Sequence, residues 1–164
     1  MNSDIKPLAF RNDGFSMYFH TEPPMTRALL EARFIDPFEG SNVGMLIWGV
    51  GPGSTLCYNT KVGEIFDEGV TEEEWGQMRP KDRWVYENVR GLIEAGADPL
   101  QVAADRGHQI GLKVYGRLEL NQEFALGTWY AIGFAGRFYK NHQEYLVPGT
   151  PHLDFKYKAV RDFK

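Results

Sequence analysis

Three polar residues at alternate positions, Arg117, Glu119 and Asn121, are the strongest candidates for chemistry in this sequence. In an extended chain alternate side chains share one face, so a guanidinium, a carboxylate and an amide would lie together, opposite Leu118 and Leu120. Such a trio can bind several sugar hydroxyls or hold a catalytic water. The same trio can also be an ion pair that stabilises the end of a strand. We predict that Glu119 is the catalytic candidate and that Arg117 and Asn121 contact substrate.

His20 and Glu22 form a second polar pair, at the end of the segment Phe15–His20 and before Pro23. A His-x-Glu pair can ligate a metal ion or transfer a proton. It can also be a hydrogen-bonded histidine beside a solvated glutamate. The other histidines lack ligand spacing, so the sequence predicts no metal site, and we expect His20 and Glu22 to contact substrate.

Aromatic residues make up 14% of the chain, and several follow predicted strands. These are Trp48, Tyr58, Trp75, Trp129 and Tyr130. Sugar rings stack on aromatic faces, whereas each of these rings taken singly also fits a hydrophobic core. Within this group we predict Trp48 and Tyr58 as substrate contacts in a platform for carbohydrate.

Composition narrows the classes of partner. The 164 residues carry a formal net charge of -4 from mixed signs, without a basic run interleaved with aromatics, so nucleic acid is not an expected partner. No apolar run approaches the roughly 18 residues that span a bilayer, and residues 1–10 do not resemble an export signal, so no membrane partner is expected and the cytoplasm is favoured. Cys57 is the single cysteine, which excludes a disulfide within the chain and any paired-cysteine motif. The sequence predicts no cofactor.

Elements that would position these residues alternate along the chain. The predicted strands cover residues 15–20, 43–50 and 110–118. The predicted helices begin at Thr26, at a capping box formed by Thr71 and Glu74, at Trp84 and at Asp98-Pro99. The long excursions, 51–83 and 119–150, both follow strands, whereas the helix-to-strand links are short.

That alternation predicts a parallel α/β architecture. Between a doubly wound sheet and a (β/α)8 TIM barrel, the long post-strand excursions favour the barrel. The final helix, from Tyr157, has an apolar stripe of only Val160 and Phe163, which suggests an incomplete layer. We therefore expect residues 1–164 to be a single partial domain, the N-terminal part of a TIM barrel truncated near its fourth strand.

Several segments carry a family resemblance. They are Asn12-Asp-Gly-Phe-Ser, His20-Thr-Glu-Pro-Pro, residues 58–64, Asp98-Pro-Leu, residues 118–121, Asn141-His-Gln-Glu-Tyr-Leu and residues 153–162. Together they resemble the N-terminal portion of glycosyl-hydrolase-like, family-10-like TIM-barrel proteins of bacteria. Where relatives often read Arg-Met-Asn after the third strand, this chain has Glu-Leu-Asn, so only Asn121 carries over.

The resemblance implies a fragment of a hydrolase that acts on a carbohydrate substrate through two carboxylates. Its principal catalytic carboxylates would lie beyond Lys164. Two alternatives stay open: a non-catalytic carbohydrate-binding or structural barrel, and a metal-dependent hydrolase that uses His20 and Glu22.

Overall fold

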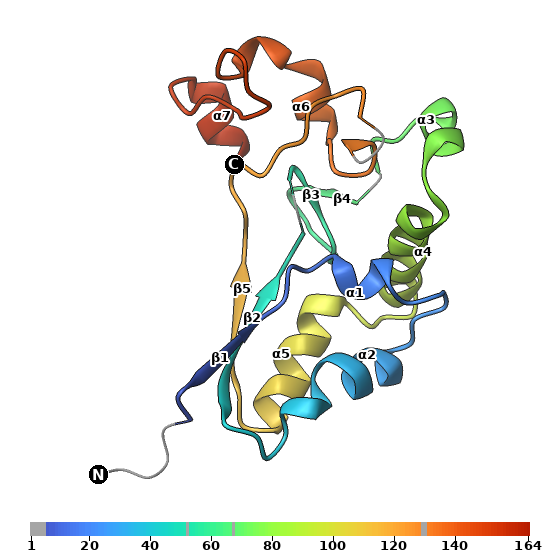
Figure 1. The fold of residues 1–164 in the computed structure, drawn as a ribbon, viewed down its shortest axis with the longest axis vertical. Helices are drawn as coiled ribbons and strands as arrows, with labels where there is room; N and C mark the ends of the chain where they lie inside the picture. Colours follow the sequence, from blue (N-terminus) through green and yellow to red (C-terminus); the bar gives the residue numbers. More distant parts are fainter. Residues whose placement is uncertain (1–5, 52, 67, 129–130) are drawn as a thin grey trace.

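The computed structural model describes residues 6–51, 53–66, 68–128 and 131–164. Its centre is a parallel sheet with the strand order β1-β2-β5 (Figure 1). The strands are β1 (Leu8–Arg11), β2 (Val43–Gly49) and β5 (Lys113–Arg117). Helices follow the strands along the chain, so the coarse prediction of an α/β fold with parallel strands is confirmed.

One face of this sheet carries the helices (Figure 1). They are α1 (Ser16–Phe19), α2 (Arg27–Phe34), the short 3-10 helix η1 (Asp36–Phe38), α4 (Pro80–Glu94) and α5 (Pro99–Gln109). Leu46 is fully buried on this face and lies in register between Phe10 of β1 and Val114 of β5. The opposite face carries Ile47 and Tyr115, and Tyr115 is half exposed. The main core therefore lies between the sheet and a single helical layer.

Local capping chemistry starts three of the helices as the sequence predicts. The Thr26 hydroxyl accepts a hydrogen bond from the Leu29 N–H (3.2 Å), and Asp98 caps α5 through the Gln101 N–H (2.9 Å). Thr71 and Glu74 form the predicted capping box at the start of α3 (Glu72–Gln77). Each bond satisfies an N–H that would otherwise lack a partner in the first helical turn.

The predicted strand over residues 15–20 is wrong, because this segment forms α1. Oδ1 of Asp13 accepts hydrogen bonds from the backbone N–H groups of Phe15 (3.0 Å) and Ser16 (2.8 Å), which favours a helical turn. The first strand lies earlier, at β1. The predicted strand 110–118 is shorter at its start, because α5 continues to Gln109 and Gly111 adopts a positive φ of 85°.

The prediction of a partial TIM barrel is also wrong. Across the described residues the main sheet is open and has three strands, and a separate small sheet pairs β3 (Thr55–Leu56) with β4 (Glu64–Ile65). After β5 the chain forms α6 (Arg137–Asn141), the 3-10 helix η3 (Gln143–Tyr145) and α7 (Lys158–Phe163). The segment expected to approach a fourth strand contributes only a local antiparallel bridge between Leu146 and Leu153.

These last helices form a C-terminal cap, defined as residues 135–164, with its own small core. Its fully or nearly buried residues are Ala135, Tyr139, Leu153 and Val160. The cap lies next to the small sheet and α3 rather than beside the main sheet (Figure 1).

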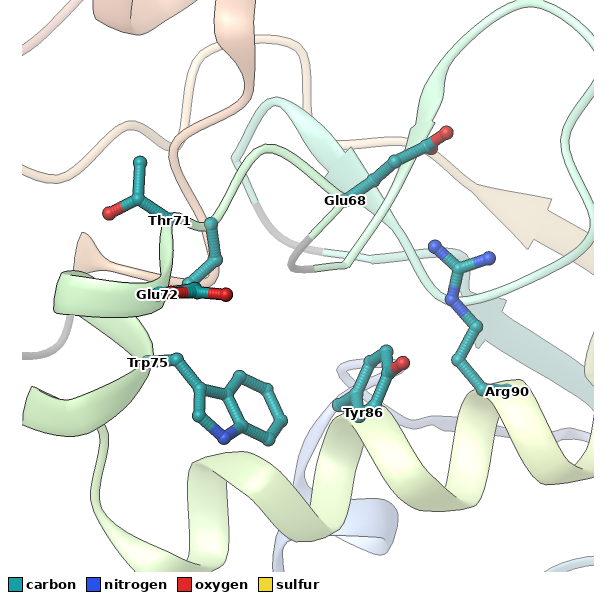
Figure 2. A pocket seen from close by; sticks show the side chains of 7 residues that line it. Glu68, Thr71, Glu72, Trp75, Tyr86 and Arg90 are labelled. Atoms are coloured by element: carbon teal, nitrogen blue, oxygen red, sulfur yellow. The ribbon is translucent and has the colours of Figure 1, made fainter.

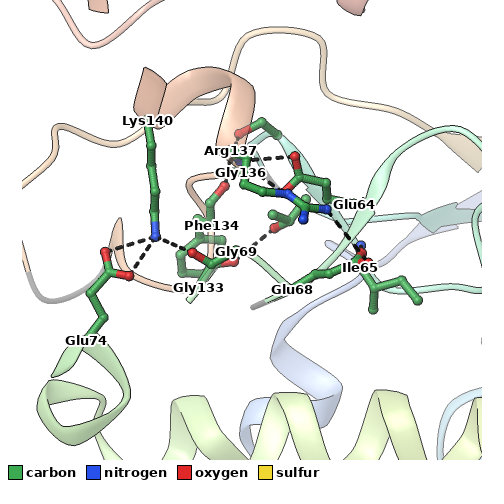
Figure 3. A network of polar contacts seen from close by, with 12 residues as sticks. Glu64, Ile65, Glu68, Gly69, Glu74, Gly133, Phe134, Gly136, Arg137 and Lys140 are labelled. Atoms are coloured by element: carbon green, nitrogen blue, oxygen red, sulfur yellow. Dashed lines mark hydrogen bonds and ion pairs between the residues drawn. The ribbon is translucent and has the colours of Figure 1, made fainter. Parts of the chain in front are cut away.

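Two residues of α6, Arg137 and Lys140, fix the cap to the excursion that follows β2 (Figure 3). The Glu64 carboxylate accepts from the Arg137 N–H (2.9 Å), and Nζ of Lys140 donates to Glu74 (2.8 Å) and to the Gly69 carbonyl (2.9 Å). The excursion is therefore a structural bridge between the sheet and the cap, and not a free loop. No helix in the described ranges combines the length and apolar character needed to cross a membrane.

Candidate functional site

The carboxyl ends of the three parallel strands meet at one edge of the sheet. β1 ends at Arg11, β2 at Gly49 and β5 at Arg117. In open α/β sheets, ligands bind in the crevice outside this edge. A cavity of about 300 Å³ lies there. Its lining consists of Arg11, Asp13, Phe15, Arg79, Glu119, Gln122, Phe124 and Phe134.

Glu119 joins the two outer strands across this edge. Its Oε1 lies 3.4 Å from Nη2 of Arg11 and is also in contact with Nη2 of Arg117. The Glu119 and Arg117 side chains are 17% and 25% exposed, whereas that of Arg11 is 57% exposed. Burial lowers the pKa of Arg117, and the nearby positive charge of Arg11 lowers it further. Nη1 of Arg117 is buried and has no hydrogen-bond partner among the described residues.

The loop after β1 is held rigidly against the end of β2. Oδ1 of Asn12 accepts from the N–H groups of Gly14 (3.1 Å) and Gly49 (3.0 Å). Gly14 has a φ of 72°, and a Cβ at this position would collide with the Gly49 carbonyl. The close backbone approach explains the Asn-Asp-Gly sequence and fixes the position of Asp13 at the cavity.

Asp13 lines the cavity, but its carboxylate already accepts hydrogen bonds from the start of α1. Burial raises its pKa, but hydrogen bonds from Ser16 and Phe15 outweigh that effect, so its pKa lies below the ordinary value of 3.8. Asp13 is therefore ionised at neutral pH and serves as an acceptor.

Phenylalanine rings form the apolar wall of the cavity. The ring centroids of Phe15 and Phe134 lie 4.7 Å apart, and those of Phe124 and Phe134 lie 5.0 Å apart. Arg79 lines the same cavity and forms a bidentate pair with Asp82, with both N to O distances 2.7 Å. The site thus combines fixed charges with a rigid aromatic surface.

The structure brings together two of the three residues predicted at alternate positions. Arg117 and Glu119 are in contact, as expected, but only Glu119 lines the cavity. Asn121 is not at the cavity, because β5 ends at Arg117 and the extended spacing does not continue. Its side-chain amide instead donates to the Leu153 carbonyl (3.1 Å) and accepts from the Leu153 N–H (3.0 Å). Asn121 therefore links the end of β5 to the C-terminal cap.

The other predicted substrate contacts lie away from this cavity. His20 and Glu22 are exposed near the end of α1, and Trp48 is 1% exposed within the main core. Tyr58 is half-buried and lines another cavity of about 370 Å³ with Asp98 and other residues. Trp129 and Tyr130 lie outside the described residues.

Sequence reasoning missed most of the lining. Arg11 and Asp13 follow β1 directly, and polar residues immediately after a strand are a useful signal for a site. The signal is missed when the first strand is predicted at residues 15–20, because Arg11 and Asp13 then precede a strand instead of following one. Phe15, Phe124 and Phe134 come from three separate segments and carry no local pattern that would group them.

The function of this site has to be inferred from its geometry. No protein-family model matches the chain, and no curated protein matches it either. Within the described ranges, no three His, Cys, Asp or Glu side chains are grouped in a way that could hold a metal ion.

Proposed function

We propose that this protein binds a glycan at the carboxyl edge of its parallel sheet, with one sugar unit in the cavity beside Glu119. The observation that carries the proposal is the combination of Arg11 and Glu119, which also pairs with Arg117, with a phenylalanine wall in one cavity. Charged groups in fixed positions form strong, directional hydrogen bonds to hydroxyls, and an aromatic wall packs against the apolar face of a sugar ring. The volume of about 300 Å³ is at the lower end of ordinary small-molecule sites.

A polar residue at the rim of the cavity also supports a polar ligand. Gln122 is exposed at the rim, so its amide can contact a second hydroxyl without any rearrangement of the core.

Binding fits this geometry better than hydrolysis. Hydrolysis of a glycosidic bond needs one protonated carboxylic acid and one carboxylate on opposite sides of the bond. Glu119 pairs with two guanidinium groups, and Asp13 is held ionised by its hydrogen bonds from Ser16 and Phe15. The catalytic role of Glu119 stays a prediction, favoured by the single observation that Asp13 and Glu119 line the same cavity.

Calorimetric titration with a panel of neutral oligosaccharides tests the proposal. We expect Glu119→Gln to weaken binding about tenfold, since a charge-assisted hydrogen bond contributes about 1.5 kcal/mol or more. Glu31→Gln is the matched control, because Glu31 also pairs with an arginine, Arg27, but lies on α2 away from the cavity. Equal affinity of the wild type and Glu119→Gln for every bound oligosaccharide would contradict the proposal. Release of reducing sugar by the wild type but not by Glu119→Gln would show hydrolysis instead.

A further inference from the structure

A second cavity, of about 370 Å³, lies between α3 and α4 and is not part of the site described above. Figure 2 shows Tyr86 between Trp75 at one end and Arg90 at the other. Glu72 lies beside Trp75 and Glu68 lies on the side of Arg90. The cavity therefore offers two aromatic rings, a guanidinium and two carboxylates from neighbouring elements.

The two aromatic rings are preformed as a corner. Their centroids lie 5.1 Å apart and their planes are nearly perpendicular, at 79°. Arg83 holds this corner together: its Nη2 donates to the Trp75 carbonyl (2.9 Å), and its guanidinium lies 5.5 Å from the centre of the Trp75 ring. A ring-shaped ligand can thus pack on Trp75 or Tyr86 without ordering a flexible surface first.

Arg90 is the unusual residue of this cavity. It lies four residues after Tyr86 on α4, with its guanidinium 5.8 Å from the Tyr86 ring centre. Within the described part of the chain it makes no hydrogen bond or ion pair, and its Nε is buried. The nearby Glu68 carboxylate already accepts from the Ile65 N–H (2.9 Å) and lies 3.9 Å from Arg137. A half-buried guanidinium without an acceptor is a site for an anionic group of a ligand.

The carboxylates of Glu68 and Glu72 favour a ligand with one negative charge over a ligand with two. Glu68 and Glu72 repel a ligand that carries two negative charges, such as a phosphate monoester, more than one that carries a single charge. The Glu72 carboxylate, at the Trp75 end, is exposed and makes no hydrogen bond or ion pair to another described residue, so it can accept hydrogen bonds from hydroxyls. A ring with one carboxylate and several hydroxyls therefore offers a partner to Arg90, to Glu72 and to the aromatic corner.

We infer that this second cavity binds a uronic acid unit, with its carboxylate on Arg90, its ring on the Trp75 and Tyr86 corner, and its hydroxyls toward Glu72. The inference extends the proposed glycan binding by naming an acidic sugar. It concerns separate residues, so variants of the two sites distinguish a failure of one from a failure of the other.

The test is a titration with glucuronate, glucose and glucose 6-phosphate, followed by the indole N–H signal of Trp75, which Trp75→Phe assigns. We expect glucuronate to bind about tenfold more tightly than glucose and more tightly than the phosphate ester, the preference that one charge-assisted contact provides. Arg90→Gln should remove the preference for glucuronate, whereas Arg27→Gln, at an exposed arginine of α2, should leave it unchanged. Unchanged melting temperature and circular dichroism of Arg90→Gln would show that its fold is intact.

Three results would overturn the inference. They are equal binding of glucuronate and glucose, a preference that survives Arg90→Gln, and tighter binding of glucose 6-phosphate than of glucuronate. If Glu119→Gln abolished the preference and Arg90→Gln did not, the acidic sugar would bind at the carboxyl edge instead. That last result would support the proposed function while rejecting the second site.

Discussion

Nζ of Lys164 lies 2.7 Å from Oε1 of Glu123, and the two side chains are only 8% and 1% exposed. This buried ion pair joins the end of α7 to the segment that follows β5. The other carboxylate oxygen of Glu123 is buried and has no hydrogen-bond partner among the described residues. The carboxylate therefore depends strongly on Lys164 for compensation of its charge.

Lys164→Met should destabilise the protein by about 3 kcal/mol, because removing one partner leaves an uncompensated buried charge. The measurement is the free energy of unfolding from urea denaturation. Lys158→Met is the matched control: Lys158 also pairs with a carboxylate on α7, that of Asp162, but both side chains are exposed and the expected loss is below about 1 kcal/mol. Equal losses in the two variants would show that the buried pair has no special role.

Gly14→Ala should destabilise the protein by more than about 2 kcal/mol. An added Cβ would collide with the Gly49 carbonyl, and the residue would also keep an unfavourable positive φ. Gly40→Ala separates the two effects, since Gly40 has a φ of 71° but no atom within 4 Å of its added Cβ. We expect Gly40→Ala to cost about 1 kcal/mol in the same urea measurement. A loss for Gly14→Ala no larger than this would contradict the close approach of the loop after β1 to the end of β2.

Asn88→Leu should cost about 3 kcal/mol or more, because Asn88 satisfies three buried backbone groups at once. Its Oδ1 accepts from the Met25 N–H (2.8 Å), and its Nδ2 donates to the carbonyls of Tyr18 (3.2 Å) and Thr21 (2.7 Å). Glu87→Leu, at the adjacent exposed position of α4, is the control and should change the free energy of unfolding by about 0.5 kcal/mol or less. A small effect of Asn88→Leu would mean that water replaces these bonds.

Tyr139 gives the C-terminal cap an alkaline pH dependence. Burial raises the pKa of Tyr139 from 10.0 to about 12, and the charge of Glu123 contributes. Because the folded-state pKa is above the unfolded value, this contribution to stability is complete below pH 10 and is lost as the pH rises toward 12.

Tyr139→Phe should therefore cost about 1 kcal/mol at neutral pH, where the hydroxyl donates to the Pro151 carbonyl (2.9 Å), and the difference from wild type should shrink between pH 10 and 12. Thermal unfolding across this pH range measures the difference. Tyr115→Phe, at a half-exposed tyrosine of β5, is the control for removal of a hydroxyl outside the cap. A constant difference between the wild type and Tyr139→Phe would contradict the raised pKa.

Local chemistry explains which parts of the fold could be predicted. Helix starts at Thr26, Thr71 and Asp98 depend on bonds between residues three apart, so the sequence shows them directly. The first strand could not be found in this way, because all four residues of β1 are exposed and carry no buried pattern. The aromatic run at Phe15–His20 has strand-like composition, but the contacts of Asp13 make it helical.

The candidate site likewise contains contacts that local sequence spacing predicts and contacts that it does not. Arg117 and Glu119 lie two residues apart, and their contact follows from local spacing. Arg11 reaches Glu119 from 108 residues away, through the register of three strands, which sequence spacing does not reveal. The predicted position of Asn121 is wrong because Asn121 bonds to the Leu153 backbone. Leu153 belongs to a cap that a barrel prediction does not include.

The most direct test of glycan binding at the carboxyl edge is an amide NMR titration of the intact protein with a neutral oligosaccharide that it binds. We predict that the largest shifts fall on residues 11–15 and 117–122, and that Glu119→Gln reduces them while Glu31→Gln does not. Shifts confined to other parts of the protein, or shifts unchanged in Glu119→Gln, would contradict the assignment of this edge as the binding site.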